Sequence, residues 1–288
     1  MSSWTARESR FPSRIAQART RAAVTSGHVR SRAAATGAAL RYDVSMFAGG
    51  LMAFFATNRP GGTGGADIWQ AQRATLDSAF VVDGPVVGVN STAEESFPRL
   101  PDDGLEVFFQ TNRDAGQWEL YRATRGAPGE TFGPPQLLTG LGVGDKWDPA
   151  VTPDGLALYY SALILPGLGD DLQHVLVARR PDRGAAFGEP ELVPGIATYG
   201  QVDAGPTTSA DERVVLFHSA RPGGAGDLDI WFATRASASE PFDTPLPLAS
   251  LNTPAADWKP YLRPDGCELY FGSNRTGNWE LYRTRVEQ

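Results

Sequence analysis

The 288-residue chain is poor in several residue types on which particular protein classes depend. Its single cysteine, Cys267, cannot form an internal disulfide, and its alternation with Leu269 and Phe271 predicts a buried small side chain. Its three histidines are scattered and form no metal-binding pattern. No apolar run is long enough to span a bilayer. We therefore predict no disulfide, no metal, no cofactor and no membrane span.

Signatures of common catalytic machinery are also missing. The sequence has no Gly-x-Ser-x-Gly nucleophile elbow, and the Ser-x-Asp-x-Gly-x-x-Trp boxes of sialidases do not occur. The repeats described below use most of the chain, which leaves no room for a separate hydrolase domain. These observations favour a binding or scaffold protein over an enzyme.

Charge is divided unevenly along the chain. Residues 1–41 hold eight arginines and one acid, which leaves 18 basic against 32 acidic residues, a net charge of −14, for the rest. Such an acidic body disfavours binding to DNA or RNA. The basic segment lacks both strand alternation and the apolar core of a secretory signal, and we interpret residues 1–37 as a disordered tail.

One pattern recurs five times in the remaining sequence. An apolar, aromatic-rich strand runs into Ser/Thr-x-Arg or a variant, then a glycine-rich turn, then an acidic residue that opens a second strand. The copies, measured at Thr57, Thr111, Ser161, Ser219 and Ser273, are 54, 50, 58 and 54 residues apart. A period of about 40 to 50 residues with several short strands is typical of a β-propeller blade.

The blades can be delimited by their turns. Pro101-Asp102-Asp103-Gly104, Pro153-Asp154-Gly155 and Pro264-Asp265-Gly266 predict tight turns between the first and second strands of a blade. We predict an all-β propeller over residues 38–288 with five four-stranded blades. The last copy ends at Gln288 after its third strand, so we expect a strand just before Tyr42 to pair with the final sheet and close the ring.

The run from Asp257 to Arg275 contains Asp-Trp-Lys-Pro, Arg-Pro-Asp-Gly and Leu-Tyr-Phe-Gly-Ser-Asn-Arg. It resembles the PD40 repeat, the WD40-like propeller repeat of TolB-type proteins, and the resemblance covers about Tyr42 to Arg285. It implies a bacterial propeller with a periplasmic or extracellular location, although no signal peptide is visible. TolB-type propellers have six blades, so the resemblance leaves six as an alternative to the five that we count.

The candidate site lies on the face where the first strands begin, opposite the Pro-Asp-Gly turns. Residues just before the blade prolines differ from blade to blade (Phe97, Asp148, Gly205 and Lys259), as expected either for asymmetric ligand recognition or for simple drift in exposed loops. Tryptophans and carboxylates flank them and offer stacking surfaces and hydrogen-bond acceptors. We expect a monomer that binds a protein segment or a carbohydrate through Glu95, Trp147, Asp148, Asp203, Trp258 and Lys259.

An alternative is a glycosidase-like enzyme in which Asp148, Asp203 and either Asp257 or Glu95 act as acid, base or nucleophile. We assign a structural role to the acids that open the third strands. The arginines Arg59, Arg113, Arg221 and Arg275 are expected to pair with Asp67, Glu119, Asp229 and Glu280 across the glycine-rich hairpins. In the third copy both members change together, to Leu163 and His174.

Overall fold

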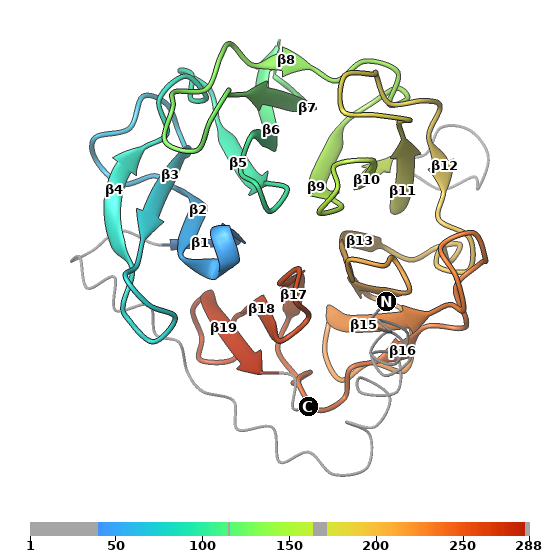
Figure 1. Cartoon of the computed structure of the whole chain (residues 1–288). Helices are drawn as coiled ribbons and strands as arrows, with labels where there is room; N and C mark the ends of the chain where they lie inside the picture. Colours follow the sequence, from blue (N-terminus) through green and yellow to red (C-terminus); the bar gives the residue numbers. More distant parts are fainter. Residues whose placement is uncertain (1–39, 115, 164–171, 286–288) are drawn as a thin grey trace, which may run out of the picture.

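Five small antiparallel sheets surround a central axis in the computed structural model of the protein (Figure 1). The structure describes residues 40–114, 116–163 and 172–285. Apart from the 3-10 turn η2 (Ala48–Gly50), the regular elements of these residues are strands. None of their helices is long and apolar enough to cross a membrane. The prediction of an all-β propeller with five blades is confirmed.

Each blade consists of strands consecutive in sequence, with the first strand nearest the axis (Figure 1). Blade one contains β1 (Leu40–Phe47), β2 (Met52–Thr57), β3 (Asp67–Gln72) and β4 (Val81–Pro85). Blade two contains β5 (Glu95–Arg99), β6 (Glu106–Asp114), β7 (Gln117–Thr124) and β8 (Gln136–Leu137). Blade three contains β9 (Lys146–Val151), β10 (Ala157–Leu163), β11 (Gln173–Arg179) and β12 (Glu191–Leu192). Blade four contains β13 (Asp203–Thr208), β14 (Val214–Ser219), β15 (Asp229–Thr234) and β16 (Leu246–Pro247). Blade five contains β17 (Asp257–Leu262), β18 (Glu268–Ser273) and β19 (Glu280–Arg285).

Blade five meets blade one through side chains. The Tyr261 hydroxyl of β17 accepts a hydrogen bond from the Met46 N–H (2.9 Å) and donates one to the Met46 carbonyl (2.8 Å). The arrangement differs from the predicted closing strand just before Tyr42. Leu40 pairs with Thr57, so this stretch belongs to β1 of blade one, and blade five has three strands in the described part of the chain. The predicted tail, residues 1–37, lies outside the described residues.

The predicted turns join first to second strands. Gly104, Gly155 and Gly266 donate their N–H groups to the carbonyls of Pro101, Thr152 and Arg263 at 2.8 to 2.9 Å. Each has a positive φ, of 66°, 77° and 68° respectively, which glycine adopts without a steric penalty. At Gly104 a Cβ would also lie 2.7 Å from the Phe47 ring.

A repeated arginine ties these inner turns to the outer rim. At the end of the third strand, the arginine Nε donates to a carbonyl of the inner turn at 2.7 to 2.8 Å, and the guanidinium lies 4.2 to 4.7 Å from a phenylalanine centroid. The arginine and phenylalanine pairs are Arg73 and Phe80, Arg125 and Phe132, Arg180 and Phe187, and Arg235 and Phe242. In blades one to four, these contacts connect the inner turn to the outer rim of the blade.

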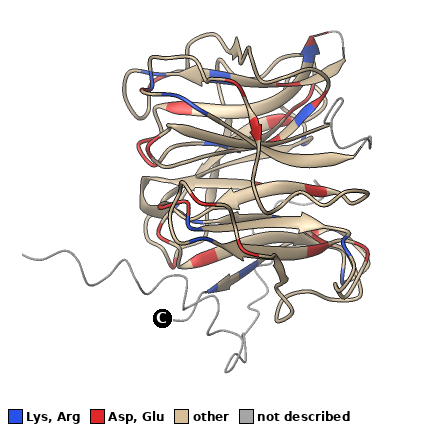
Figure 2. Ribbon diagram, turned by 90° about the vertical axis from the view of Figure 1, so that its right-hand side faces the viewer, with Lys and Arg blue, Asp and Glu red and all other residues tan. Residues whose placement is uncertain are grey.

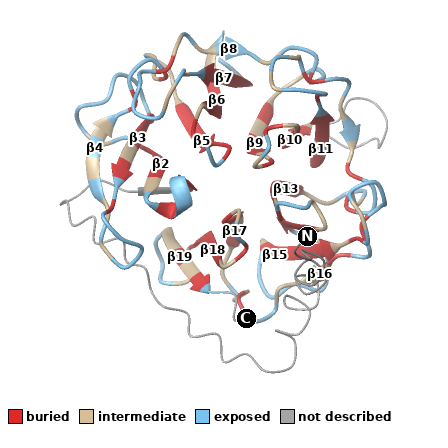
Figure 3. Cartoon of the chain, in the orientation of Figure 1, coloured by how far each residue is buried: buried red, intermediate tan, exposed pale blue. Residues whose placement is uncertain are grey.

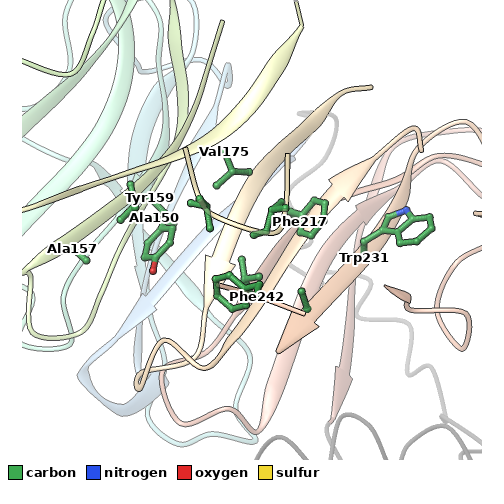
Figure 4. Close-up of a cluster of buried hydrophobic side chains, with 12 residues drawn as sticks. Ala150, Ala157, Tyr159, Val175, Phe217, Trp231 and Phe242 are labelled. Carbon is green, nitrogen blue, oxygen red and sulfur yellow. The ribbon is translucent and has the colours of Figure 1, made fainter. Parts of the chain in front are cut away.

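Most of the hydrophobic core lies between neighbouring blades. The second strands are buried on both faces, as predicted, and β14 is buried at every residue. The same holds for β18, which is coloured red in Figure 3. Figure 4 shows the cluster between blades three and four, where Tyr159 and Val175 face Phe217, Trp231 and Phe242. Neighbouring blades therefore stabilise one another, and the ring positions the residues around the axis.

Candidate functional site

The residue before the proline of the first strand has a left-handed backbone in blades two to five. The φ angles are 52° at Phe97, 53° at Asp148, 62° at Gly205 and 50° at Lys259. A register shift occurs at this point of each first strand. A left-handed conformation costs a non-glycine residue about 1 to 2 kcal/mol, so surrounding contacts must hold these residues in place.

Side chains of the preceding blade hold the displaced amides. The Asp148 N–H donates to Gln110 Oε1 at 2.8 Å, and the Gly205 N–H donates to Ser161 Oγ at 2.9 Å. The Lys259 N–H lies 3.4 Å from His218 Nδ1, its acceptor. Gln110, Ser161 and His218 occupy matching places on the second strands, opposite Ser96, Trp147 and Ala204.

For the displaced amide of Phe97, the acceptor in blade one comes from the first strand and not from the second. Ala56 holds the matching place there and has no acceptor in its side chain. Asp43 of β1 replaces it: its carboxylate accepts the Phe97 N–H at 2.6 Å and the Ala56 N–H at 3.2 Å. Burial raises the pKa of Asp43 to about 6, against the opposing effect of these backbone donors and of Arg99 and Lys259.

Three of the left-handed residues meet across the axis. The Lys259 Nζ lies 3.0 Å from Asp148 Oδ1 and 3.6 Å from the centroid of the Phe97 ring. These residues come from blades five, three and two, and blade five neighbours only blades four and one in the ring. The contacts must therefore cross the centre of the molecule. The Asp148 and Lys259 side chains are 5% and 15% exposed, so the ammonium retains limited access to solvent.

Aromatic side chains flank this axial group. The rings of Trp258 and Trp279 lie 4.4 Å apart at an interplanar angle of 31°. The Lys259 Nζ lies 4.8 Å from the Trp258 ring, and the His218 ring meets the same indole edge-on at 6.0 Å. Trp147 is half-buried and occupies the place in β9 that Trp258 occupies in β17. Burial lowers the pKa of His218 to about 4, which keeps its imidazole neutral near pH 7.

The other predicted site residues are buried within their own blades. Glu95 accepts hydrogen bonds from the Ser91 N–H (2.8 Å) and the Thr111 hydroxyl (2.8 Å) and pairs with Arg113 at 3.1 Å. The same arrangement recurs in blades four and five, where the acid pairs with its arginine at 2.6 Å and its side chain is 0% exposed. The acids are Asp203 and Asp257, and their arginines are Arg221 and Arg275.

The predicted pairing across the glycine-rich hairpins is therefore wrong. The arginines of blades two, four and five bind the acid of the first strand, because that carboxylate lies beside the second strand from which the arginine extends. The hairpin acids have other partners. Asp67 and Asp229 accept backbone N–H groups of their own hairpins at 2.7 to 3.2 Å, while Glu119 pairs with Lys146 at 3.0 Å.

The third blade lacks this network for a visible reason. Its first strand begins with Lys146, where blades two, four and five have an acid, and Lys146 binds Glu119 of blade two. His174 does hold the place of the hairpin acid, as predicted, but it lies opposite Ala162. The repeat is therefore phased at Ala162 and not at Ser161, and the place of the arginine falls at residue 164, outside the described residues, instead of at Leu163.

The residues 40–114, 116–163 and 172–285 contain no group of three His, Cys, Asp or Glu side chains that could hold a metal ion. Acidic and basic segments are interspersed on the side of the molecule in Figure 2. The distinctive chemistry of the entry face, the face where the first strands begin, is an ion pair across the axis beside stacked indole rings.

Comparison with solved structures supports the fold assignment. An endo-arabinase from Bacteroides thetaiotaomicron is 14% identical with a TM-score of 0.62 over 88% of this chain and 95% of that one. A thermostable family-43 glycoside hydrolase is 13% identical with a TM-score of 0.59 over 86% and 88%. TolB from Acinetobacter baumannii is 14% identical with a TM-score of 0.53, over 85% of this chain and 54% of that one.

No protein-family model matches the sequence, and no curated protein sequence matches it. At these identities the structural similarity shows a propeller fold alone. It includes a TolB protein, in line with the resemblance of the repeats, and also glycoside hydrolases.

Proposed function

We propose that the protein is a non-catalytic binding propeller that engages a protein segment or a glycan at its entry face. The supporting observation is the axial group, in which Lys259 contacts Asp148 and Phe97 from non-adjacent blades. Scaffold positions repeat from blade to blade, whereas this position holds a different residue in each of blades two to five. At these positions three non-glycine residues keep a strained, left-handed backbone.

The ligand would contact Trp147, Asp148, Trp258 and Lys259. Indole rings stack on sugar faces as well as on proline and other side chains, and the charged pair supplies orientation. Glu95 and Asp203, fully buried and paired with arginine, would position the entry loops without touching the ligand.

The second candidate is a glycoside hydrolase, which the structural similarity to such enzymes favours. That chemistry requires two carboxyl groups that reach the substrate, one acting as acid and the other as base or nucleophile. Glu95, Asp203 and Asp257 are 0% exposed and bound to arginine. Of the carboxylates assigned to this role, only Asp148 lies in the axial group, and Lys259 neutralises it. A binding role therefore agrees better with the geometry.

The test is to apply the labelled full chain to a glycan array and to a peptide array, with Trp258→Ala and Trp147→Ala as site variants. Leu137→Ala, on the outer rim and 41% exposed, is the matched control. We expect a signal on one array that falls at least about tenfold in the tryptophan variants, equivalent to about 1.4 kcal/mol, and persists in the control. Signals equal in all variants, or no signal on either array, would contradict the proposal. Cleavage of an arrayed oligosaccharide by the wild type would favour the hydrolase.

A further inference from the structure

A small cavity lies on the axis near the Pro-Asp-Gly turns, at the opposite end from the axial ion pair. Its volume is about 30 Å³, and residues from the first strands of all five blades line it. One from each blade is Ser45, Arg99, Ala150, Thr207 and Tyr261. About 10 to 15 Å³ is needed to hold one water, so the cavity has room for about two waters or one small ion.

The guanidinium of Arg99 lines this cavity without a directly paired anion. Arg99 is 7% exposed, and its Nη1 donates to the carbonyls of Pro98 (2.9 Å) and Val44 (3.2 Å). Its Cζ lies over the Tyr261 ring, 5.1 Å from the ring centroid. In the described part of the chain its Nε has no hydrogen-bond partner, and no ion pair to Arg99 is formed. A buried arginine with unused donors is unusual, because desolvation of the charge is normally offset by a carboxylate.

The carboxylates nearest to Arg99 are already engaged. Asp43 accepts two backbone N–H groups, and Asp148 is paired with Lys259. Burial lowers the pKa of Arg99. The charges of Asp43 and Asp148, together with Tyr261, oppose this effect without fully offsetting it. The cationic group is therefore stabilised from a distance by two carboxylates. Because Nη1 donates to two carbonyls and Nε is buried, Nη2 is the nitrogen through which Arg99 can reach the cavity.

The cavity wall is otherwise suited to an anion. None of its lining residues is acidic. The Thr207 Oγ1 accepts the Leu262 N–H at 3.2 Å, which leaves its own O–H as a donor. Leu100, Val151 and Leu262 also line the cavity and supply apolar surface that strengthens electrostatic attraction.

We propose that this axial cavity binds a small anion, a halide or a carboxylate of formate size, with Arg99 as its charge partner and Thr207 as a hydroxyl donor. The anion connects first strands of different blades at the centre of the ring, so its binding stabilises the folded protein. The site is independent of the proposed ligand site, from which the contacts among Lys259, Asp148 and Phe97 separate it along the axis.

Unfolding of the full chain at matched ionic strength tests the proposal. The salts are sodium chloride, sodium formate and sodium gluconate, whose anion is too large for the cavity. We expect the unfolding midpoint of the wild type to rise with chloride or formate relative to gluconate, and the active salt identifies the anion. Arg99→Met should lose at least four fifths of this rise. Arg180→Met is the control, since Arg180 is 4% exposed but is paired with Glu106 and does not line the cavity, and this variant should keep the rise.

A second measurement does not depend on whether Arg99→Met folds. Crystals of the wild type grown in sodium bromide should show an anomalous peak within hydrogen-bond distance of the Arg99 guanidinium, which chloride displaces. Equal midpoints in all three salts, together with density for water alone in the cavity, would overturn the proposal. A rise of the same size in Arg99→Met as in the wild type would also overturn it.

Discussion

The Lys259 ammonium lies 3.0 Å from the Asp148 carboxylate although the two residues belong to blades that do not touch along the ring. Both side chains are at least 85% removed from solvent, so each charge depends on the other for compensation. The ring brings side chains of non-adjacent blades together at its axis, so this single ion pair links blades three and five directly.

The first prediction concerns this pair. Lys259→Met should destabilise the fold by about 3 kcal/mol, because it leaves a buried carboxylate without its cation. Asp148→Asn should cost a similar amount, and the double variant should be more stable than the sum of the two losses implies. Urea unfolding of the four proteins measures the coupling. Additive losses would show that the two charges do not interact.

The second prediction concerns Gly205, whose Cβ would lie 2.6 Å from His218 Nδ1. Gly205→Ala should cost about 1 to 2 kcal/mol for the left-handed backbone and about 1 to 3 kcal/mol more for the clash. Gly142→Ala is the control, because Gly142 has a φ of 87° and no atom within 4 Å of a built Cβ. Denaturant unfolding should rank the variants in that order. Equal losses would mean that His218 moves aside freely.

Much of this architecture can be read from the sequence, because turns and apolar strands obey local rules. The Pro-Asp-Gly turns and the buried second strands follow from proline, glycine and aromatic residues at fixed spacing. The different residues before the blade prolines also mark the positions that meet at the axis.

Pairing between side chains is less accessible to sequence reasoning. The arginines of the hairpins have an acid within reach on two strands, and only the three-dimensional arrangement selects Glu95, Asp203 and Asp257. Asp43, Gln110 and His218 could not be assigned because their partners lie in the next blade, and Arg99 could not because its environment is the axis itself. In the sequence, the second-strand acceptors can be recognised only by their place in the repeat, because Gln110 and His218 directly precede Thr111 and Ser219.

The third prediction concerns the seam between blades five and one. Tyr261→Phe removes a hydroxyl that both accepts from and donates to the backbone of Met46. Two buried backbone groups lose their partner, at about 1 to 3 kcal/mol each. Tyr160→Phe is the control, because its hydroxyl donates only to the Leu141 carbonyl at 2.8 Å. We expect about twice the loss of unfolding free energy in the Tyr261 variant. A smaller loss than in Tyr160→Phe would refute a ring-closing role.

The fourth prediction is a pH dependence set by Asp43. Its pKa is raised by burial to about 6 in the folded protein, whereas an unfolded aspartate titrates near about 3.9. The native state therefore binds more protons between these values, so the contribution of Asp43 to stability decreases as pH rises from about 4 to 6 and stays low above that. Two pH units correspond to a loss of about 3 kcal/mol.

Asp43→Asn keeps an oxygen for the Phe97 N–H but removes the titration. His218 acts in the opposite direction over part of this range, because its pKa is lowered to about 4, and it is present in both proteins. The informative quantity is therefore the difference in unfolding free energy between wild type and variant, measured by urea unfolding at pH 4 and pH 7. We expect this difference to move by about 2 kcal/mol in favour of the variant as the pH rises, because the unfolded aspartate is already half ionised at pH 4. A difference independent of pH would mean that Asp43 titrates at its ordinary value, and that the donors around its carboxylate offset the cost of burying the charge.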